Sequence, residues 1–278
     1  MSELELEQRS ADKARRKRCL ILAAVFLALV VVVIVAVALA LRPKTHTFKS
    51  LFIDRCNKHT KKRNDCQKVY SAFAQAYIEQ DPCRVSMDAY DPLVASAPFE
   101  PACNRMMFWS RTKDVVHDFT EKKDCFVTLE DTLLGSVLDG LTWCGKEGSR
   151  ETFTTGCPGW DECVNNPVRS FWTRVSAAFA DVACGDVTAM LNGSIRTPFS
   201  PSSIFGSIEV VRFNATRVKS LEVVLVSDRT EVANCTSSSF EDLQKVLDKE
   251  IKYNCNEVTH VELEECSADV EKPCGACW

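Results

Sequence analysis

Three carboxylates, an indole and a thiol are packed into one short run of the chain, TLEDTLLGSVLDGLTWCG, which covers residues 128–145. Acidic side chains beside apolar ones indicate a pocket that binds a polar ligand. The alternative is structural, because Glu130 and Asp131 also suit the first turn of a helix, where acids interact favourably with the helix dipole. The side chains that this run offers for chemistry are Glu130, Asp131, Asp139, Trp143 and Cys144.

Three further groups of residues carry side chains that suit ligand binding. One places an aromatic ring, a hydroxyl and a guanidinium in succession, one places a hydroxyl a helical turn after a tryptophan, and one puts an isolated acid in a strand-like run. Each tryptophan taken singly also fits a hydrophobic core, and the isolated acid also fits the outer face of a strand. Spacing alone therefore does not assemble these groups into one site. They are Trp109, Ser110 and Arg111; Trp172 and Ser176; and Glu209, in the run SIFGSIE.

A long uncharged segment near the N-terminus predicts a membrane anchor. Residues 20–41 contain no charged side chain, and as a helix they span roughly 33 Å, close to the hydrocarbon core of a bilayer. Four consecutive basic residues, 15–18, precede the segment, so the positive-inside rule keeps the N-terminus in the cytoplasm. The alternative is a cleaved signal peptide, whose apolar region is usually shorter, about 7–15 residues. The pattern therefore favours a type II, single-pass protein of the plasma membrane.

This topology divides the chain into four parts. We expect a cytoplasmic tail at 1–19, a signal anchor at 20–41, a stalk at 42–55 and an extracellular domain at 56–278.

The cysteines support an extracellular domain. The chain has 15 of them, and Cys19 lies at the cytoplasmic edge of the anchor, where it is either idle or a palmitoylation site. The others form an even set between Cys56 and Cys277, which is typical of a disulfide framework. A metal site is not expected, because the chain has 4 His and none stands at a paired ligand spacing with Cys. The CGAC run at 274–277 is therefore interpreted as two half-cystines.

Glycosylation sequons and the net charge limit the kinds of molecule that the protein is expected to bind or carry. Asn192 and Asn214 begin N-x-S/T motifs and are predicted glycosylation sites, whereas Asn234 is followed by Cys235, which can be bridged. The formal net charge is −4 and no long basic run follows the anchor. Nucleic-acid binding is accordingly disfavoured.

Hydrophobic periodicity predicts a mixed fold of two lobes. Helical spacing dominates the first part, and the clearest helix begins at Asn166-Pro167, a good N-cap followed by a proline at the first helical position. Short β-branched runs then alternate with a helix that opens on a Ser238–Glu241 capping box. The expected helices cover 69–78, 114–119, 128–141, 167–185 and 238–252, and the expected strands cover 187–191, 207–213, 221–226 and 258–263.

The motifs together resemble those of the ADP-ribosyl cyclase/cyclic ADP-ribose hydrolase family. The blocks TLEDTLLG…LTWCG, WSR, NNPV-x-x-FW and FGSIE occur in the family's order, and the resemblance extends from about Cys56 to Cys274. The N-terminal anchor makes the chain similar in plan to the type II membrane members rather than to the lipid-linked ones.

The resemblance implies a fold and a set of disulfides. The fold class is α/β, in the sense of an α+β molecule with two lobes: a mainly helical N-terminal lobe and a C-terminal lobe with a short parallel sheet flanked by helices. A central cleft separates the lobes, and Cys125 and one of Cys274 and Cys277 are additional to the framework, where they can form a further pair. The implied framework half-cystines are Cys56, Cys66, Cys83, Cys103, Cys144, Cys157, Cys163, Cys184, Cys235, Cys255, Cys266 and Cys274.

It also implies roles for single residues. Glu209 matches the catalytic glutamate of the family, and Glu130 matches the acid that holds the nicotinamide amide. The implied activity is extracellular cleavage of NAD⁺ to ADP-ribose, with cyclase and cyclic ADP-ribose hydrolase activities; NADP⁺ is a further substrate and no cofactor is needed. The implied binding residues are Trp109, Trp172, Asp139, Ser110, Arg111, Ser176 and Phe205.

Two positions depart from the family pattern. Ile204 stands where the membrane ectoenzymes typically have a threonine, and Gly140 stands where a second acid is usual. We expect both to alter contacts around the substrate and neither to abolish activity. The rival hypothesis is a non-enzymatic receptor or adhesion domain on the same fold, which has no reason to keep both glutamates and both tryptophans. An ectoenzyme can also bind a cell-surface protein partner.

Overall fold

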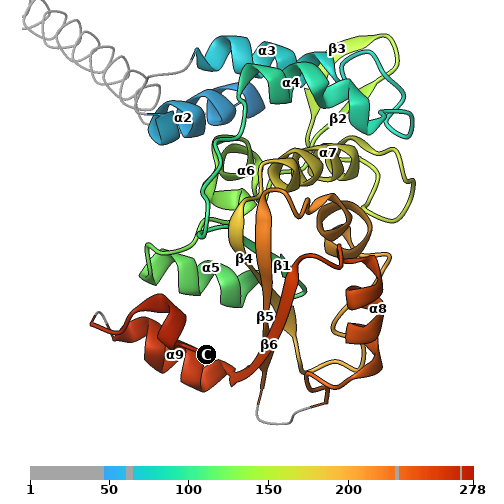
Figure 1. Ribbon diagram of the computed structural model, residues 1–278. Coiled ribbons are helices and arrows are strands. Elements are labelled where there is room, and N and C mark those ends of the chain that lie inside the picture. Colours follow the sequence, from blue (N-terminus) through green and yellow to red (C-terminus); the bar gives the residue numbers. More distant parts are fainter. Residues whose placement is uncertain (1–46, 61–64, 229–231, 270) are drawn as a thin grey trace, which may run out of the picture. The chain divides into compact units, whose positions relative to one another are not determined.

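A computed structural model describes residues 47–278, apart from 61–64, 229–231 and 270 (Figure 1). The predicted tail, the predicted anchor, Cys19 and the start of the predicted stalk lie outside the described residues. The folded unit that carries the rest of the chain runs from Phe48 to Trp278. Within the described residues, every helix is too short or too polar to span a bilayer.

The core of the C-terminal half is a sheet of four parallel strands. These are β1 (Met107–Ser110), β4 (Gly185–Asn192), β5 (Val218–Ser227) and β6 (Lys252–Thr259), in the order β1-β4-β5-β6. Parallel strands need crossover connections, and the helices of those crossovers bury both faces of the sheet. The predicted strands 187–191 and 221–226 are confirmed and are the two central strands.

Alternating side chains give the sheet two different buried faces. Met107, Met190 and Val224 belong to a cluster with α5 (Lys113–Lys122) and α9 (His260–Ala268). Their neighbours Phe108, Ala189 and Val223 belong to the larger cluster that includes α7 (Pro167–Asp181). Successive side chains of each strand therefore enter a buried cluster on one face of the sheet and then on the other, as expected for a sheet covered on both faces.

The N-terminal half is mainly helical and centres on aromatic rings. Phe73 lies 5.2 Å from both Phe52 and Trp143 and 5.0 Å from Tyr77, measured between ring centroids. The elements are α2 (Phe48–Thr60), α3 (Cys66–Gln75), η1 (Met87–Tyr90), α4 (Asp91–Ser96), η2 (Leu129–Asp131), α6 (Leu133–Leu138), β2 (Cys144–Lys146) and β3 (Ser149–Phe153).

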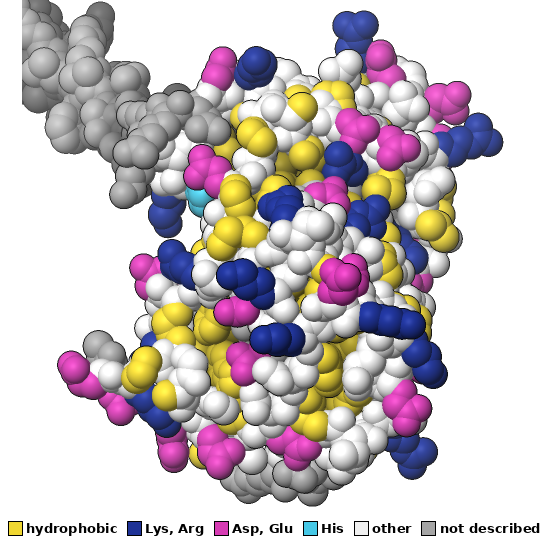
Figure 2. Space-filling view, in the orientation of Figure 1, with side chains coloured by type: hydrophobic (Ala, Val, Ile, Leu, Met, Phe, Trp, Pro, Cys, Tyr) yellow, Lys and Arg dark blue, Asp and Glu magenta, His cyan; other side chains and the backbone are white. Residues whose placement is uncertain are grey.

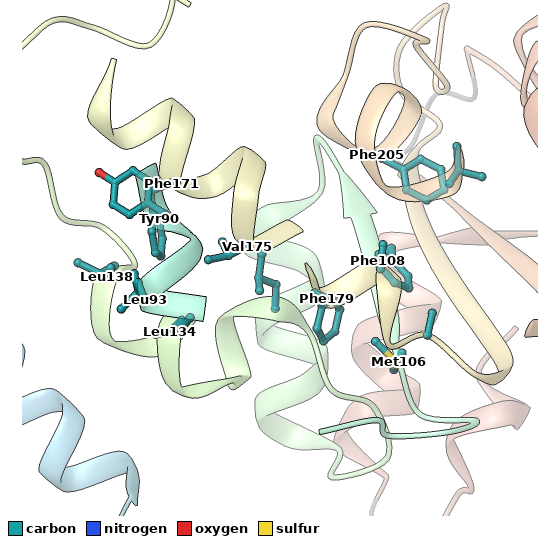
Figure 3. Close-up of a cluster of buried hydrophobic side chains, with 14 of the residues drawn as sticks. Tyr90, Leu93, Met106, Phe108, Leu134, Leu138, Phe171, Val175, Phe179 and Phe205 are labelled. Atoms are coloured by element: carbon teal, nitrogen blue, oxygen red, sulfur yellow. The ribbon is translucent and has the colours of Figure 1, made fainter. Parts of the chain in front are cut away.

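Helix α7 packs against both the helical half and the sheet, within the larger buried cluster (Figure 3). Near its N-terminus, Phe171 meets Tyr90 at 5.5 Å, and two turns later Phe179 meets Phe108 of β1 at 5.2 Å. Asn166 caps the helix, because its Oδ1 accepts a hydrogen bond from the Arg169 N–H at 2.9 Å. The predicted cap and apolar stripe are thus confirmed, and the same helix contributes to the helical part and to the sheet.

The predicted stalk is wrong from residue 48 onward. Residues 48–55 are part of α2, whose Phe52 is fully buried against Tyr70 and Phe73. Burial of such a ring belongs to a folded domain rather than to a spacer. The boundary expected at residue 56 therefore moves to Phe48.

The strand predicted at 207–213 is also wrong. This segment consists of a π-helical turn, η3 (Phe205–Glu209), and a 3₁₀ turn, η4 (Val210–Arg212). The β-branched residues Ile208, Val210 and Val211 suggested a strand, but tertiary packing overrides that local preference. Glu209 therefore lies on a helical segment and not on a strand.

Two further boundaries differ near the C-terminus. Helix α8 (Ser238–Val246) is shorter than predicted, and its N-cap, Ser237, makes no side-chain capping bond, so the expected capping box is absent there. The strand predicted at 258–263 is wrong beyond its first two residues, because the last strand is β6 (Lys252–Thr259) and a capping box of Thr259 and Glu262 begins α9. The T-x-x-E spacing that signals this box was present in the sequence.

All described cysteines are paired in seven disulfides, so the twelve predicted half-cystines are confirmed. Cys125 does have a partner, which is Cys274, and Cys277 bonds Cys266. The framework therefore contains Cys277 where we had assigned Cys274. The remaining pairs are Cys56–Cys66, Cys83–Cys163, Cys103–Cys184, Cys144–Cys157 and Cys235–Cys255.

Charges of both signs are mixed on the surface. On the face shown in Figure 2, Lys and Arg side chains are interspersed with Asp and Glu. One lysine is an exception, because Lys123 is only 6% exposed and its ammonium donates hydrogen bonds to the carbonyls of Asp269 and Lys272. It holds the C-terminal segment that includes η5 (Cys274–Ala276) against α5.

Replacing Lys123 with Met is expected to destabilise the protein by about 1–3 kcal/mol, because two carbonyls lose a charged donor. The midpoint of urea unfolding measures the change. Lys122→Met is the matched control: that ammonium pairs with Asp118 at 2.7 Å on the exposed surface, where water screens the pair, so its loss should change stability much less. Equal losses for the two variants would contradict an anchoring role for Lys123.

Candidate active site

The nine side chains that the family resemblance implied for catalysis or binding all line one cavity of about 500 Å³. The cavity is bounded by the end of β1, by α7 and by η3, and its volume is typical of a small-molecule site. Its position beside the carboxyl end of a parallel strand is where ligands usually bind in such sheets. The nine are Trp109, Ser110, Arg111, Glu130, Asp139, Trp172, Ser176, Phe205 and Glu209.

Glu209 is the most perturbed acid of the cavity. It is 6% exposed, and burial raises the pKa of its carboxyl to about 8. The Ser176 hydroxyl hydrogen-bonds the carboxyl and lowers this pKa, whereas the nearby charge of Glu130 raises it. A buried carboxyl with a strongly shifted pKa in a cleft is a candidate for the chemical step.

The position of Glu209 depends on a close backbone approach at Gly206. A Cβ at Gly206 would lie 2.2 Å from the carbonyl oxygen of Ser200, so only glycine allows η3 to approach that backbone. The wide turn of η3 then buries both Phe205 and Glu209. Phe205 contacts Phe199 at 6.2 Å and forms part of the cavity wall.

Glu130 is held by an indole. Trp109 donates its Nε1–H to Oε2 of Glu130 at 3.1 Å, so these two predicted residues form one unit. The neighbouring acid, Asp131, has a different role, because its Oδ2 accepts from the N–H and the hydroxyl of Thr128. Glu130 therefore lines the cavity, as the ligand-pocket explanation requires, whereas Asp131 caps a helical turn, as the structural explanation requires.

His117 is a site residue that the sequence did not indicate. Its Nε2 lies 3.6 Å from Oε2 of Glu130, and this carboxylate raises the pKa of His117 above 6.5 although partial burial lowers it. One carboxylate oxygen thus faces an indole donor and an imidazole. Lys113 and His117 are four residues apart on α5, and this helical spacing could have predicted that both lie on the same face of the helix.

The His117–Glu130 ion pair predicts a pH-dependent stability. A raised histidine pKa gives stabilisation that is complete below pH 6.5 and is lost as the pH rises through the folded-state pKa. We expect His117→Gln to be less stable than the unsubstituted protein at about pH 5.5 and similar to it at about pH 9, by urea unfolding. His59→Gln is the control, because His59 meets a carbonyl of Asp131 and not a carboxylate. A deficit that did not change with pH would exclude this ion pair as its cause.

Asp139 is paired with a lysine that sequence reasoning missed. Lys113 donates to Oδ1 of Asp139 at 2.6 Å, and Arg55 donates to the carbonyl oxygen of Asp139 at 2.8 Å. Asp139 is followed by Gly140, whose φ of 69° favours glycine, so the expected departure at this position also satisfies a backbone requirement. Asp139 and Gly140 both line the cavity.

The rings of Trp172 and Trp160 form an aromatic part of the cavity wall. Trp172 lies on α7 with its ring 5.1 Å from Phe171, and Trp160 comes from the loop before α7 and was not predicted. Asn166 fixes that loop, because its Nδ2 donates to the carbonyls of Gly159, Trp160 and Cys163. The residue that begins the helix therefore also positions an aromatic ring of the site.

The rim beside β1 holds Ser110 and Arg111. Arg111 has a left-handed backbone with φ 59°, unusual for a residue with a side chain, and its carbonyl accepts from Nδ2 of Asn192 at 3.2 Å. Thr112 donates its hydroxyl to the carbonyl of Met190 at 2.9 Å. Contacts to β4 thus hold the turn that presents the guanidinium.

The predicted glycosylation sites differ in their surroundings. Asn214 is exposed, and its Oδ1 accepts from the N–H and hydroxyl of Thr216, the third residue of its sequon. Asn192 is partly buried at the end of β4, and its Nδ2 already donates to Arg111. Glycosylation of either residue stays a prediction, and Asn214 is the more accessible of the two.

The fold and the cavity define a class of protein. It is a disulfide-bonded α/β protein with a cavity lined by both carboxylates and tryptophans, an arrangement that suits a cationic, partly aromatic ligand. The model of the ADP-ribosyl cyclase family matches residues 45–275, so the chain belongs to that family.

Relatives and solved structures agree with this assignment. ADP-ribosyl cyclase/cyclic ADP-ribose hydrolase 1 of Mus musculus is 37% identical over 216 residues, which cover 74% of this chain and 71% of the relative. The structure of porcine CD38 with a covalent intermediate, ribo-F-ribose-5′-phosphate, is 37% identical with a TM-score of 0.73 and covers 77% of this chain and 97% of that one. Aplysia cyclase with substrate NGD and product cGDPR is 27% identical with a TM-score of 0.72, covering 82% and 96%.

Proposed function

We propose that this protein is an NAD⁺ glycohydrolase that cleaves the nicotinamide–ribose bond to give ADP-ribose, with ADP-ribosyl cyclase and cyclic ADP-ribose hydrolase activities. NADP⁺ and cyclic ADP-ribose are further substrates. The observation that carries the proposal is the cavity of about 500 Å³ in which buried Glu209 lies near the Trp109–Glu130 pair. The names of the relatives and the family supply the substrate class.

The chemistry of NAD⁺ explains why one carboxylate suffices. The leaving nicotinamide departs as a neutral molecule from a cationic pyridinium, so no acid is needed to protonate it. The ribosyl centre that remains is oxocarbenium-like, and Glu209 can stabilise its charge or bond to it, as the nucleophile of a retaining glycosidase does. The cationic substrate favours the ionised form of Glu209, which offsets the rise that burial causes in the pKa of this carboxyl.

The other side chains bind and orient. The Glu130 carboxylate can accept the carboxamide N–H of nicotinamide, and the indole of Trp109 keeps that carboxylate in place. Trp172 and Trp160 offer aromatic faces to a ring that carries positive charge. Ser110 and Arg111 at the rim suit the phosphates.

The product depends on what attacks the ribosyl centre. Water gives ADP-ribose, and the adenine of a folded intermediate gives cyclic ADP-ribose. An aromatic wall that excludes water favours the second outcome, whereas the opening left by Gly140, whose missing Cβ would meet nothing within 4 Å, favours the first. We therefore expect mostly ADP-ribose.

We also propose a location. Residues 20–41 act as a type II anchor in the plasma membrane, and the domain from Phe48 onward faces the outside. The seven disulfides support an oxidising compartment, because such bonds are rare in the cytosol. Binding of a protein partner at the cell surface needs no part of the cavity and is compatible with this function. Digestion of intact cells by an added protease, with loss of surface activity, tests the orientation.

Product analysis tests the activity. Residues 45–278 are incubated with NAD⁺, and nicotinamide, ADP-ribose and cyclic ADP-ribose are separated by chromatography. We expect nicotinamide and mostly ADP-ribose, with a minor cyclic product. Failure to release nicotinamide would refute the proposal and favour a binding domain on this fold.

A further inference from the structure

A second cavity adjoins the one described above. Its volume is about 330 Å³, and the two cavities share the side chains of Trp160 and Ile204 as walls. A ligand that fills the first cavity and extends past these two residues therefore reaches the second. Its wall consists of Met87, Trp160, Val164, Asn165, Arg169, Ser170, Thr173, Ser202, Ser203, Ile204, Ser207 and Ile208.

The charge of the second cavity is positive. Arg169 is the one charged residue among those that line it, and no lining residue in the described part of the chain is a carboxylate. Arg169 pairs with Asp161 outside this lining, but the two groups are 3.7 Å apart and the Asp161 side chain is 91% exposed, so water screens the pair. The guanidinium also donates to the carbonyl of Trp160 at a long 3.4 Å. Five donors with such weak partners leave capacity for an anion.

The neutral groups of the cavity suit a nucleoside. The ring of Trp160 is 41% exposed, and Arg169 lies 5.8 Å from its centroid, so an aromatic face and a cation are presented together. The side chains of Asn165 and Thr173 make no hydrogen bond within the described residues, whereas Ser203 and Ser207 donate to backbone carbonyls. An amide and a hydroxyl are therefore available to a polar ligand. Met87, Val164 and Ile208 add apolar surface for a base.

The two cavities together define the orientation of a dinucleotide. If the nicotinamide end lies at Trp109 and Glu130, the end that passes Trp160 and Ile204 is the adenosine. We propose that the second cavity binds this adenosine end and that Arg169 pairs with a phosphate on its 2′-hydroxyl, so that the protein selects the 2′-phosphorylated dinucleotide, NADP⁺, over NAD⁺. The inference rests on the proposed function for the identity of the substrate.

Steady-state kinetics with the two dinucleotides test the selection. We expect kcat/KM to be higher for NADP⁺ than for NAD⁺, and Arg169→Gln to lower the value for NADP⁺ roughly tenfold, the worth of about one charge-assisted hydrogen bond, while that for NAD⁺ stays nearly constant. Arg174→Gln is the matched control on the same helix. Its guanidinium pairs with Asp91 at 2.5 Å and lines neither cavity, so the NADP⁺ to NAD⁺ ratio should not change.

Calorimetric binding separates this inference from the proposed reaction. ADP-ribose and its 2′-phosphate are titrated into the unsubstituted protein and into Arg169→Gln, so no turnover is needed. We expect the 2′-phosphate to bind more tightly, with about a tenfold advantage that Arg169→Gln removes. An equal loss for both ligands would place Arg169 on the shared pyrophosphate and overturn the 2′ assignment. No change for either ligand would exclude Arg169 from the site, even if NAD⁺ is cleaved.

Discussion

Glu209→Gln is expected to lower kcat for NAD⁺ cleavage by at least about 10²–10³-fold while leaving KM within a few-fold. The amide keeps the shape of the side chain and can still hydrogen-bond Ser176, but it can neither neutralise the ribosyl cation nor bond to it. Because the loss is confined to the transition state, it should appear in kcat. Nicotinamide release, followed over time, measures it.

A matched control keeps this result interpretable. Glu241 is an exposed acid in the first turn of α8, and Glu241→Gln should leave turnover unchanged. A Glu209→Gln variant that turned over NAD⁺ at the normal rate would require another group to stabilise the transition state.

The same substitution should also stabilise the protein at high pH. With a pKa of about 8, the native Glu209 keeps a proton that the unfolded chain releases above about pH 4.5, so stability falls as the pH rises between these values. The amide has no proton to lose. Each pKa unit is worth about 1.4 kcal/mol, so Glu209→Gln should gain up to a few kcal/mol over the unsubstituted protein at about pH 9 and little at about pH 4, in urea unfolding. A constant difference would mean that Glu209 is not buried as described.

The second large effect is expected for Gly206→Ala. The new Cβ would lie 2.2 Å from the Ser200 carbonyl oxygen and 2.9 Å from Cα of Pro201, and both are backbone atoms that can yield only if the chain moves. We expect a loss of about 1–3 kcal/mol in stability or more. Displacement of Glu209 by about 1 Å would in addition lower kcat by roughly 10²-fold. Thermal unfolding and the nicotinamide assay measure the two effects.

Gly275→Ala provides the comparison, because a Cβ there would meet nothing within 4 Å. It should change neither stability nor turnover by a measurable amount. If Gly206→Ala behaved in the same way, the close approach of η3 to Ser200 would not be what positions Glu209.

Local signals predicted the parts of the fold where local chemistry decides the structure. The Asn166 cap, the apolar stripe of α7 and the two central strands depend on a hydrogen bond to the next turn or on simple periodicity, and all were correct. The segment around Glu209 was predicted as a strand because Ile208, Val210 and Val211 are β-branched. Its π-helical turn depends on the contact of Gly206 with Ser200, which composition does not reveal.

The site was predictable through whole motifs and not through single residues. Glu130 and Asp131 are adjacent and chemically alike, and only the 3₁₀ turn that Thr128 caps separates a cavity residue from a capping residue. His117 and Lys113 were missed because their importance depends on how α5 faces residues 130 and 139, a relation between segments that no spacing encodes.

The order of strands has a consequence for when the site forms during synthesis. Strand β1, which carries Trp109, is an edge strand whose neighbour in the sheet is β4, and Ser110 and Gly185 are about 75 residues apart. At about 5–20 residues per second, a ribosome needs roughly 4–15 s to make that neighbour. Cys103 is synthesised 81 residues before its disulfide partner Cys184, a similar delay. Cys66, by contrast, follows its partner Cys56 after only 10 residues. Until Cys184 is made, the thiol of Cys103 can bond only to other cysteines, and any such wrong disulfide must afterwards be exchanged for the native one.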